Sequence, residues 1–178
     1  MNFRTIGRFA IPSAALTLGI LVGCTPPPTA ADTPKPIELR AVTVAELDDE
    51  IRSHRGKVVL IDVWFLGCAP CVKKMPQFIE LHRELQSEGL VCMTLDTYAE
   101  ELKKKDKVLE FLKEKGADTI NLIIADRVQK QDDWIDKYDC ARTPAYVAFD
   151  RRGEFVRPPE PADKENMTRF LKKLLADK

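Results

Sequence analysis

The pattern of apolar positions divides residues 41–176 into alternating strands and helices. Three continuous apolar runs are typical of strands that a sheet buries on both faces, and they lie at 58–64, 90–95 and 120–125. Elsewhere apolar residues recur every three or four positions, which predicts amphipathic helices at 41–54, 72–85, 106–115, 128–138 and 162–176. Thr43 is a suitable N-cap for the first of these helices.

A turn-rich segment near the C-terminus separates two further short apolar runs. Asp150-Arg151-Arg152-Gly153 lies between residues 145–149 and 154–156, an arrangement that predicts a β-hairpin. Strands that alternate with helices predict an α/β fold. Because the hairpin adds antiparallel strands, we expect a mixed central sheet flanked by helices.

The N-terminus has the pattern of a targeting segment. Arg4 and Arg8 precede an uncharged apolar run at 9–22, which is shorter than the ~20 residues of a transmembrane helix. Residues 1–23 are therefore predicted to be a secretory signal peptide. The run ends in Leu21-Val22-Gly23-Cys24, which resembles the lipobox of bacterial lipoproteins, where the cysteine is lipidated. The alternative is a plain signal peptide followed by a chance cysteine.

Residues 24–38 are predicted to be a lipidated cysteine followed by a proline-rich tether. Five prolines lie between positions 25 and 36, so this stretch has little to pack and should be semi-extended. Acyl chains on Cys24 would hold the protein at a membrane, outside the cytoplasm, in the periplasm or at the cell surface. Residues 39–178 are the predicted folded domain.

Composition and charge narrow the function classes. The chain of 178 residues is 44% hydrophobic and 31% charged, which suits one soluble domain with appendages. Its 28 basic residues balance 28 acidic ones, so nothing favours nucleic acid as a partner. The odd number of cysteines, five, argues against a disulfide-stapled scaffold.

The motif Cys68-Ala69-Pro70-Cys71 carries the strongest chemical signal. It falls between a buried strand and a helix, which places Cys68 at the helix N-terminus, where free N–H groups and the helix dipole stabilise a thiolate. Cys71 lies one turn further along, where it can resolve a mixed disulfide. These positions predict thiol-disulfide exchange at a redox-active dithiol. No cofactor is expected, because the two sulfurs carry the electrons.

Residues 56–64 followed by this motif resemble the thioredoxin superfamily. More narrowly, residues 39–178 are similar to the extracytoplasmic thiol-disulfide oxidoreductases of the TlpA/ResA type. Trp64 stands four residues before Cys68, and Pro76 stands five after Cys71, as in the family. The resemblance implies a thioredoxin fold. The long stretch between the motif helix and Thr143-Pro144 implies the inserted strand and helix of the TlpA/ResA type.

The resemblance also implies roles for individual residues. Asp62 stands where thioredoxin has a buried acid. Burial should raise the pKa of its carboxyl, so that Asp62 can accept the proton of Cys71. The alternative is a carboxylate that caps a backbone group. Thr143-Pro144 matches the position of the family's cis-proline. A cis bond here would expose the Thr143 backbone to a substrate strand. The alternative is an ordinary loop proline. Trp64 is placed at the substrate-binding surface, with packing beside the site as its main expected role.

Two positions depart from the family pattern. Gly67 stands where the family usually has an aromatic residue, so we expect a more open and less aromatic rim around Cys68. Residues 157–161, Arg-Pro-Pro-Glu-Pro, replace a loop that contains a glycine in thioredoxin. This loop should be stiffer and could favour a particular partner surface.

Two further cysteines leave alternatives open. Cys92 and Cys140 fall at apolar positions and are most simply buried free thiols. A disulfide between them, or a redox role for Cys140 near Pro144, is the alternative. No metal site is predicted, because a zinc site needs about four ligands and no second Cys or His pair is present. A peroxidase is disfavoured, since the Thr-x-x-Cys arrangement is absent.

Taken together, the sequence predicts a monomeric, lipid-anchored thiol-disulfide oxidoreductase of exported proteins. The resemblance favours reduction, with electrons from a membrane thiol donor and with substrates such as apocytochrome c, and therefore a role in cytochrome c biogenesis. The alternative is a membrane-tethered binding or chaperone module of the same fold with incidental redox activity.

Overall fold

The computed structural model describes residues 36–126 and 128–177. The predicted signal peptide, Cys24 and the tether as far as residue 35 lie outside these residues. Within the part of the chain that is described, no helix is both long enough and apolar enough to cross a membrane.

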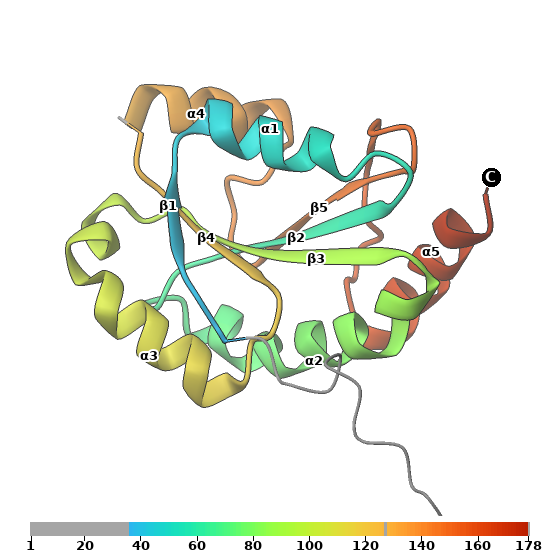
Figure 1. Cartoon of the computed structure of the whole chain (residues 1–178), viewed down its shortest axis with the longest axis horizontal. Coiled ribbons are helices and arrows are strands. Elements are labelled where there is room, and N and C mark those ends of the chain that lie inside the picture. Colours follow the sequence, from blue (N-terminus) through green and yellow to red (C-terminus); the bar gives the residue numbers. More distant parts are fainter. Residues whose placement is uncertain (1–35, 127, 178) are drawn as a thin grey trace, which may run out of the picture. The chain divides into compact units, whose positions relative to one another are not determined.

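The described residues form six strands and five α-helices in an alternating order (Figure 1). The strands are β1 Arg40–Val42, β2 Val58–Trp64, β3 Leu90–Asp96, β4 Ile120–Ile124, β5 Ala145–Phe149 and β6 Phe155–Val156. The helices are α1 Val44–Ser53, α2 Ala69–Leu85, α3 Lys105–Lys115, α4 Val128–Lys137 and α5 Lys164–Ala176, and the short 3₁₀ helices are η2 Gln86–Glu88 and η3 Ala99–Lys104. The α/β class is confirmed.

All six strands belong to one sheet with the order β1-β4-β3-β2-β5-β6. Its first four strands are parallel, and β5 and β6 are antiparallel to their neighbours, so the predicted mixed sheet and C-terminal hairpin are confirmed. The central strand β2 pairs with β3 on one side and β5 on the other, and all seven of its residues are buried.

Helices cover both faces of this sheet. Helices α1 and α4 lie over one face, and α2, α3 and α5 lie over the other (Figure 1). Successive side chains of β2 alternate between the two layers: Ile61 and Val63 pack in the cluster with α1 and α4, whereas Val58 and Leu60 pack with α2 and α5. A strand buried on both faces needs the continuous apolar run seen in the sequence.

The start of the domain differs from the prediction. Residues 41–54 were expected to be one helix, but Arg40–Val42 form the edge strand β1, which pairs in parallel with Leu122–Ile124 of β4. A three-residue strand is too short to show a period of its own, so the helical pattern that follows masks it. Thr43 does cap α1, as predicted, through a capping box with Glu46.

The predicted inserted helix and strand are α3 and β4. They follow β3 in the chain, and β4 enters the sheet between β3 and β1. The buried Asn121 ties β4 in place: its side-chain oxygen accepts hydrogen bonds from the Thr94 and Thr119 hydroxyls, each at 2.9 Å. Its amide nitrogen donates to three backbone carbonyls, those of Glu38, Ala117 and Thr119.

Candidate redox site

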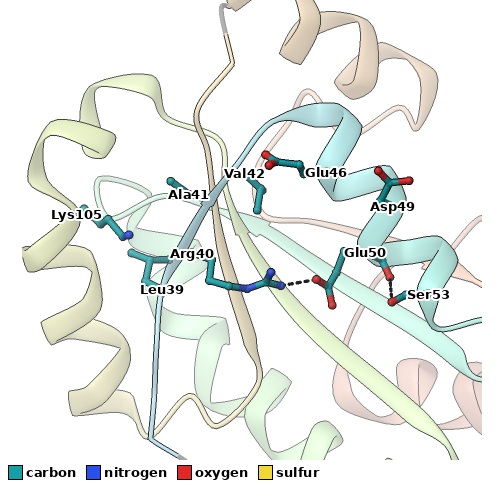
Figure 2. Close-up of a pocket in the computed structure, with 9 residues that line it drawn as sticks. All are labelled: Leu39, Arg40, Ala41, Val42, Glu46, Asp49, Glu50, Ser53 and Lys105. Carbon is teal, nitrogen blue, oxygen red and sulfur yellow. Dashed lines mark hydrogen bonds and ion pairs between the residues drawn. The ribbon is translucent and has the colours of Figure 1, made fainter.

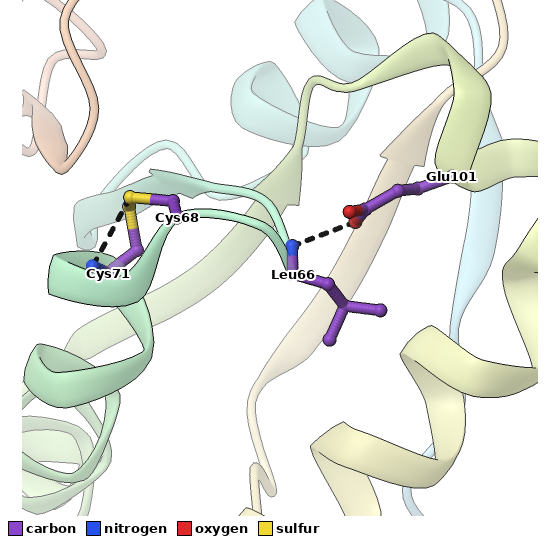
Figure 3. The surroundings of a disulfide bond; sticks show 4 residues. All are labelled: Leu66, Cys68, Cys71 and Glu101. Carbon is purple, nitrogen blue, oxygen red and sulfur yellow. Dashed lines mark hydrogen bonds between the residues drawn. A yellow bond between two sulfur atoms is a disulfide. The ribbon is translucent and has the colours of Figure 1, made fainter.

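Cys68 and Cys71 form a disulfide at the N-terminus of α2. Cys68 is the N-cap residue, Pro70 lies in the first turn, and the two Cα atoms are 5.2 Å apart. The Cys68 sulfur accepts the Cys71 N–H at 3.3 Å (Figure 3). This contact is the local interaction expected to favour a thiolate at Cys68, because a free N–H of the first helical turn points at the sulfur.

The two sulfur-bearing residues differ in accessibility. Cys68 is 5% exposed, whereas Cys71 is fully buried. Of the two, only Cys68 keeps any exposed surface. The roles of Cys68 as attacking cysteine and Cys71 as resolving cysteine stay predictions.

Asp62 lies on β2 within the core, 1% exposed. Burial raises the pKa of its carboxyl to about 7, and the ammonium of Lys74, one turn along α2 from Cys71, offsets part of that rise. Within the described residues its buried Oδ2 atom has no hydrogen-bond partner. This oxygen therefore caps no backbone group among the described residues, and the role of Asp62 as acceptor of the Cys71 proton stays a prediction.

Asp62 belongs to a small buried polar cluster with Tyr146 and Cys92. Tyr146 lies directly opposite it on β5, and Cys92 lies on β3 opposite Leu60, on the same face of the sheet. Burial raises the pKa of the Cys92 thiol and of the Tyr146 hydroxyl, and the charge of Asp62 raises each further. At neutral pH both groups therefore stay protonated beside Asp62.

Cys92 and Cys140, the other two cysteines among the described residues, are free and buried, so the disulfide considered between them is absent. Cys140 donates its S–H to the Ile135 carbonyl at 3.6 Å, and burial raises the pKa of its thiol to about 12. A thiol held in its protonated form is a poor nucleophile. Neither residue therefore has the environment of a second redox thiol.

Thr143 and Pro144 lie at the same end of the sheet as the cysteine motif. Val63 pairs with Ala145, so the end of β2 and the residues before β5 meet at one edge, and the Thr143–Pro144 bond is cis, as the family pattern implies. Both residues are half-buried and line a groove of about 480 Å³, which also includes Lys74 and loop 157–161. The sequence did not indicate that the Glu160–Pro161 bond in this loop is also cis.

Trp64 lies beneath the site rather than on its surface. It is fully buried, and its ring packs against Phe111 of α3 with the ring centroids 5.3 Å apart. A substrate cannot touch this side chain in the oxidised structure. The structure therefore supports the packing role of Trp64 and not a substrate contact.

The rim beside Cys68 is more aromatic than expected. Phe65 stacks on Tyr98 with the ring centroids 5.3 Å apart, and Tyr98 is 50% exposed. A Cβ atom at Gly67 would lie 3.1 Å from the Phe65 ring, so this ring occupies the space next to the glycine. The prediction missed the pair because Tyr98 comes from the segment after β3.

A separate surface hollow lies next to the edge strand β1 (Figure 2). Arg40 reaches across it to an ion pair with Glu50 of α1, and Lys105 of α3 lines its far side. Its lining contains no cysteine, histidine or aromatic residue. It therefore has none of the groups that thiol chemistry needs.

Comparison with known proteins places the chain in a family. A family model described as Redoxin matches residues 38–171. The chain belongs to the redoxin family. It is 24% identical over 126 residues to the thiol-disulfide oxidoreductase ResA of Bacillus thuringiensis, covering 70% of this chain and 68% of that protein.

Solved structures agree with this membership of the redoxin family at the level of the fold. The thioredoxin domain of a thiol-disulfide oxidoreductase from Bacteroides vulgatus superposes with a TM-score of 0.57 at 19% identity, covering 70% of this chain and 83% of that one. A thiol:disulfide interchange protein from Bacteroides sp. gives a TM-score of 0.56 at 21% identity, covering 74% and 80%. The thioredoxin fold, the TlpA/ResA-type resemblance and the class of thioredoxin-like oxidoreductase are confirmed.

The raised pKa of Asp62 predicts a specific dependence of stability on pH. The folded state keeps this proton up to about pH 7, whereas an unfolded Asp loses it near pH 4, so stability falls as pH rises through that window. We expect Asp62→Asn to remove this fall. The free energy of unfolding of Asp62→Asn minus that of wild type should therefore increase by up to about 4 kcal/mol between pH 4 and pH 7. Urea unfolding of both oxidised proteins at each pH measures this difference.

The matched control is Asp132→Asn, which changes an exposed carboxylate on α4. Its stability curve should run parallel to that of wild type. A difference between Asp62→Asn and wild type that stays constant from pH 4 to pH 8 would show that Asp62 is ionised in the folded protein.

Proposed function

We propose that the protein reduces disulfide bonds in exported proteins by cycling between the Cys68–Cys71 dithiol and disulfide. The observation that carries the proposal is the paired geometry of the cysteines: Cys68 caps α2 and keeps 5% of its surface exposed, while Cys71 lies one turn further along and is fully buried. A thioredoxin-like oxidoreductase needs this asymmetry, because one sulfur attacks the substrate disulfide and the other resolves the mixed disulfide afterwards.

The reaction proceeds through two exchanges. The Cys68 thiolate attacks one sulfur of the substrate disulfide, and the other substrate sulfur leaves as a thiolate. Cys71 then gives up its proton and attacks the Cys68 sulfur of the mixed disulfide, which releases the second substrate thiolate. Two electrons pass from the protein to the substrate, and the protein is left as the Cys68–Cys71 disulfide.

Asp62 is the proposed acceptor of the Cys71 proton. A carboxyl with a pKa of about 7 can take up and release a proton at neutral pH. An aspartate with an ordinary pKa is ionised at that pH and binds a proton only weakly. The carboxyl is buried, and Lys74 supplies a compensating charge. The same group would return the proton when a donor reduces the disulfide again.

The substrate chain would bind in extended form along Thr143. Thr143 and Pro144 are half-buried at the rim of a groove, where a backbone N–H and carbonyl can pair with a passing strand. The groove also carries the cations Lys74 and Arg157, and Arg157 is paired with Asp139. Backbone pairing suits a protein that reduces several different substrates.

The N-terminal pattern and the family resemblance suggest where the protein works. A signal peptide at 1–23 and lipidation of Cys24 would hold the monomeric domain at a membrane outside the cytoplasm, on a tether formed by residues 24–38. A membrane thiol donor would then supply the electrons, since disulfides persist in that compartment. Cysteines of apocytochrome c are a fitting substrate class.

Loss of the resolving cysteine should trap the substrate. We expect Cys71→Ser to accumulate mixed disulfides through Cys68, because the second exchange cannot occur, and these adducts are detected on non-reducing gels of membrane fractions. Cys68→Ser should form none, and Cys92→Ser, which changes a buried free thiol, should behave as wild type. A Cys68→Ser/Cys71→Ser variant that keeps full function in cells would favour the binding-module alternative instead.

The reduction potential of the Cys68–Cys71 pair determines whether the protein reduces or oxidises its substrates. Equilibration of residues 39–178 in thiol buffers, followed by thiol trapping, should give a value near that of thioredoxin, about −270 mV. Such a value makes the protein a reductant that needs an electron donor. A value near −120 mV would make it an oxidant and would overturn the proposed direction.

Lipidation of Cys24 has its own test. In cells that express the full chain, wild type should fractionate with membranes and incorporate labelled palmitate. The variant Cys24→Ser should lose the label and appear in the soluble extracytoplasmic fraction. Membrane association that survives this substitution would exclude the lipid as the anchor.

A further inference from the structure

The loop that leads from β2 to Cys68 is held by a carboxylate distant in sequence. The Leu66 N–H donates to Oε2 of Glu101 at 2.8 Å, and Figure 3 shows this carboxylate directed at the backbone two residues before Cys68. Glu101 lies on η3 and is 7% exposed. Buried glutamates are rare unless a partner compensates them, so the contact needs an explanation.

Asp96, the last residue of β3, is the partner of Glu101. It is fully buried, and its Oδ1 atom accepts the Tyr98 N–H at 2.9 Å, while Oδ2 has no N–H or O–H donor among the described residues. Burial, followed by the hydrogen bond with Glu101, raises the pKa of the Asp96 carboxyl to about 8. A proton on the Asp96 carboxyl would supply the missing donor, and Glu101, which already accepts the Leu66 N–H, is the side chain that would receive it.

A second set of contacts ties the same segments together. The Thr97 N–H donates to the Trp64 carbonyl at 3.2 Å, and Gln131 of α4 donates its side-chain amide to the Thr97 carbonyl. Residues 96–101 therefore bridge the helix α4 and the loop before Cys68. A displacement of this bridge would move the residue that caps α2.

We propose that Glu101, through the proton it shares with Asp96, is a positioning residue that fixes the loop at Leu66 and so sets the reactivity of Cys68. The inference rests on the proposed thiol-disulfide exchange, which it deepens. Glu101 does not touch the substrate or the sulfurs; it acts through one backbone N–H. The pair needs no cation, because a single shared proton removes the repulsion between the two carboxyls.

Three substitutions separate the hydrogen bond from the charge. Glu101→Gln keeps an oxygen that accepts from Leu66 and an amide that donates to Asp96, whereas Glu101→Ala removes both contacts. Asp96→Asn supplies a donor to Glu101 that does not titrate. The matched control is Glu100→Ala, the adjacent residue on η3, which is exposed and pairs with Lys103.

The probe is glutathione disulfide, with the second-order rate and the equilibrium constant of exchange measured by thiol trapping. We expect Glu101→Ala to react roughly tenfold more slowly than wild type, because a small displacement of a reacting group has a large effect on rate. Glu101→Gln and Glu100→Ala should stay within about twofold. If Glu101→Ala matches Glu100→Ala, or if Glu101→Gln is as slow as Glu101→Ala, the proposal is wrong.

The pH profile tests the shared proton even if Glu101→Ala does not fold. Above about pH 8 wild type loses this proton and Asp96→Asn does not, so the ratio of the wild-type rate to the Asp96→Asn rate should fall between pH 7 and pH 10. Groups whose titration is the same in both proteins cancel in this ratio. A ratio that is constant over this range would overturn the proposal, whereas a wild type inert to glutathione disulfide would instead refute the exchange reaction itself.

Discussion

Burial of the central strand β2 on both faces and along both edges is the constraint on which the other parts of the site depend. Its backbone pairs in parallel with β3 and antiparallel with β5, so the end of β2 and the start of β5 must lie together. The end of β2 leads to the Cys68 loop, and Pro144 immediately precedes β5. Strand pairing thus places the cysteine motif and Thr143–Pro144 at the same edge of the sheet.

The same strand carries an ionisable group at a position where an apolar residue would be more stable. Asp62 lies in a core layer whose other strand residues are mostly apolar, and its register partners, Thr94 on β3 and Tyr146 on β5, are also buried. Burying a carboxyl is unfavourable unless it becomes neutral, which explains the rise in its pKa. Local rules of core composition are commonly broken at functional sites, and this position fits that pattern.

The inserted elements do more than extend the sheet. Strand β4 separates β1 from β3, and the chain between β3 and α3 passes over the loop before Cys68. There Tyr98 stacks on Phe65, and Glu101 accepts the Leu66 N–H. The insertion and the redox motif are therefore one structural unit. A substitution in the segment 97–101 is expected to change the position of the loop before Cys68.

The sequence by itself determined the features that have a local physical cause. Continuous apolar runs and three-to-four spacing located the major strands and helices, and the motif at 68–71 identified the chemistry, because helix termini and buried strands have recognisable composition. The family pattern added Asp62 and the Thr143–Pro144 pair. The tertiary structure decided the rest: the pairing of Arg40–Val42 with β4, the burial of Trp64, the aromatic rim at Gly67 and the Glu101 contact. Each of these joins residues that lie far apart in the chain, and a contact of that kind leaves no periodic signal in the sequence around either partner.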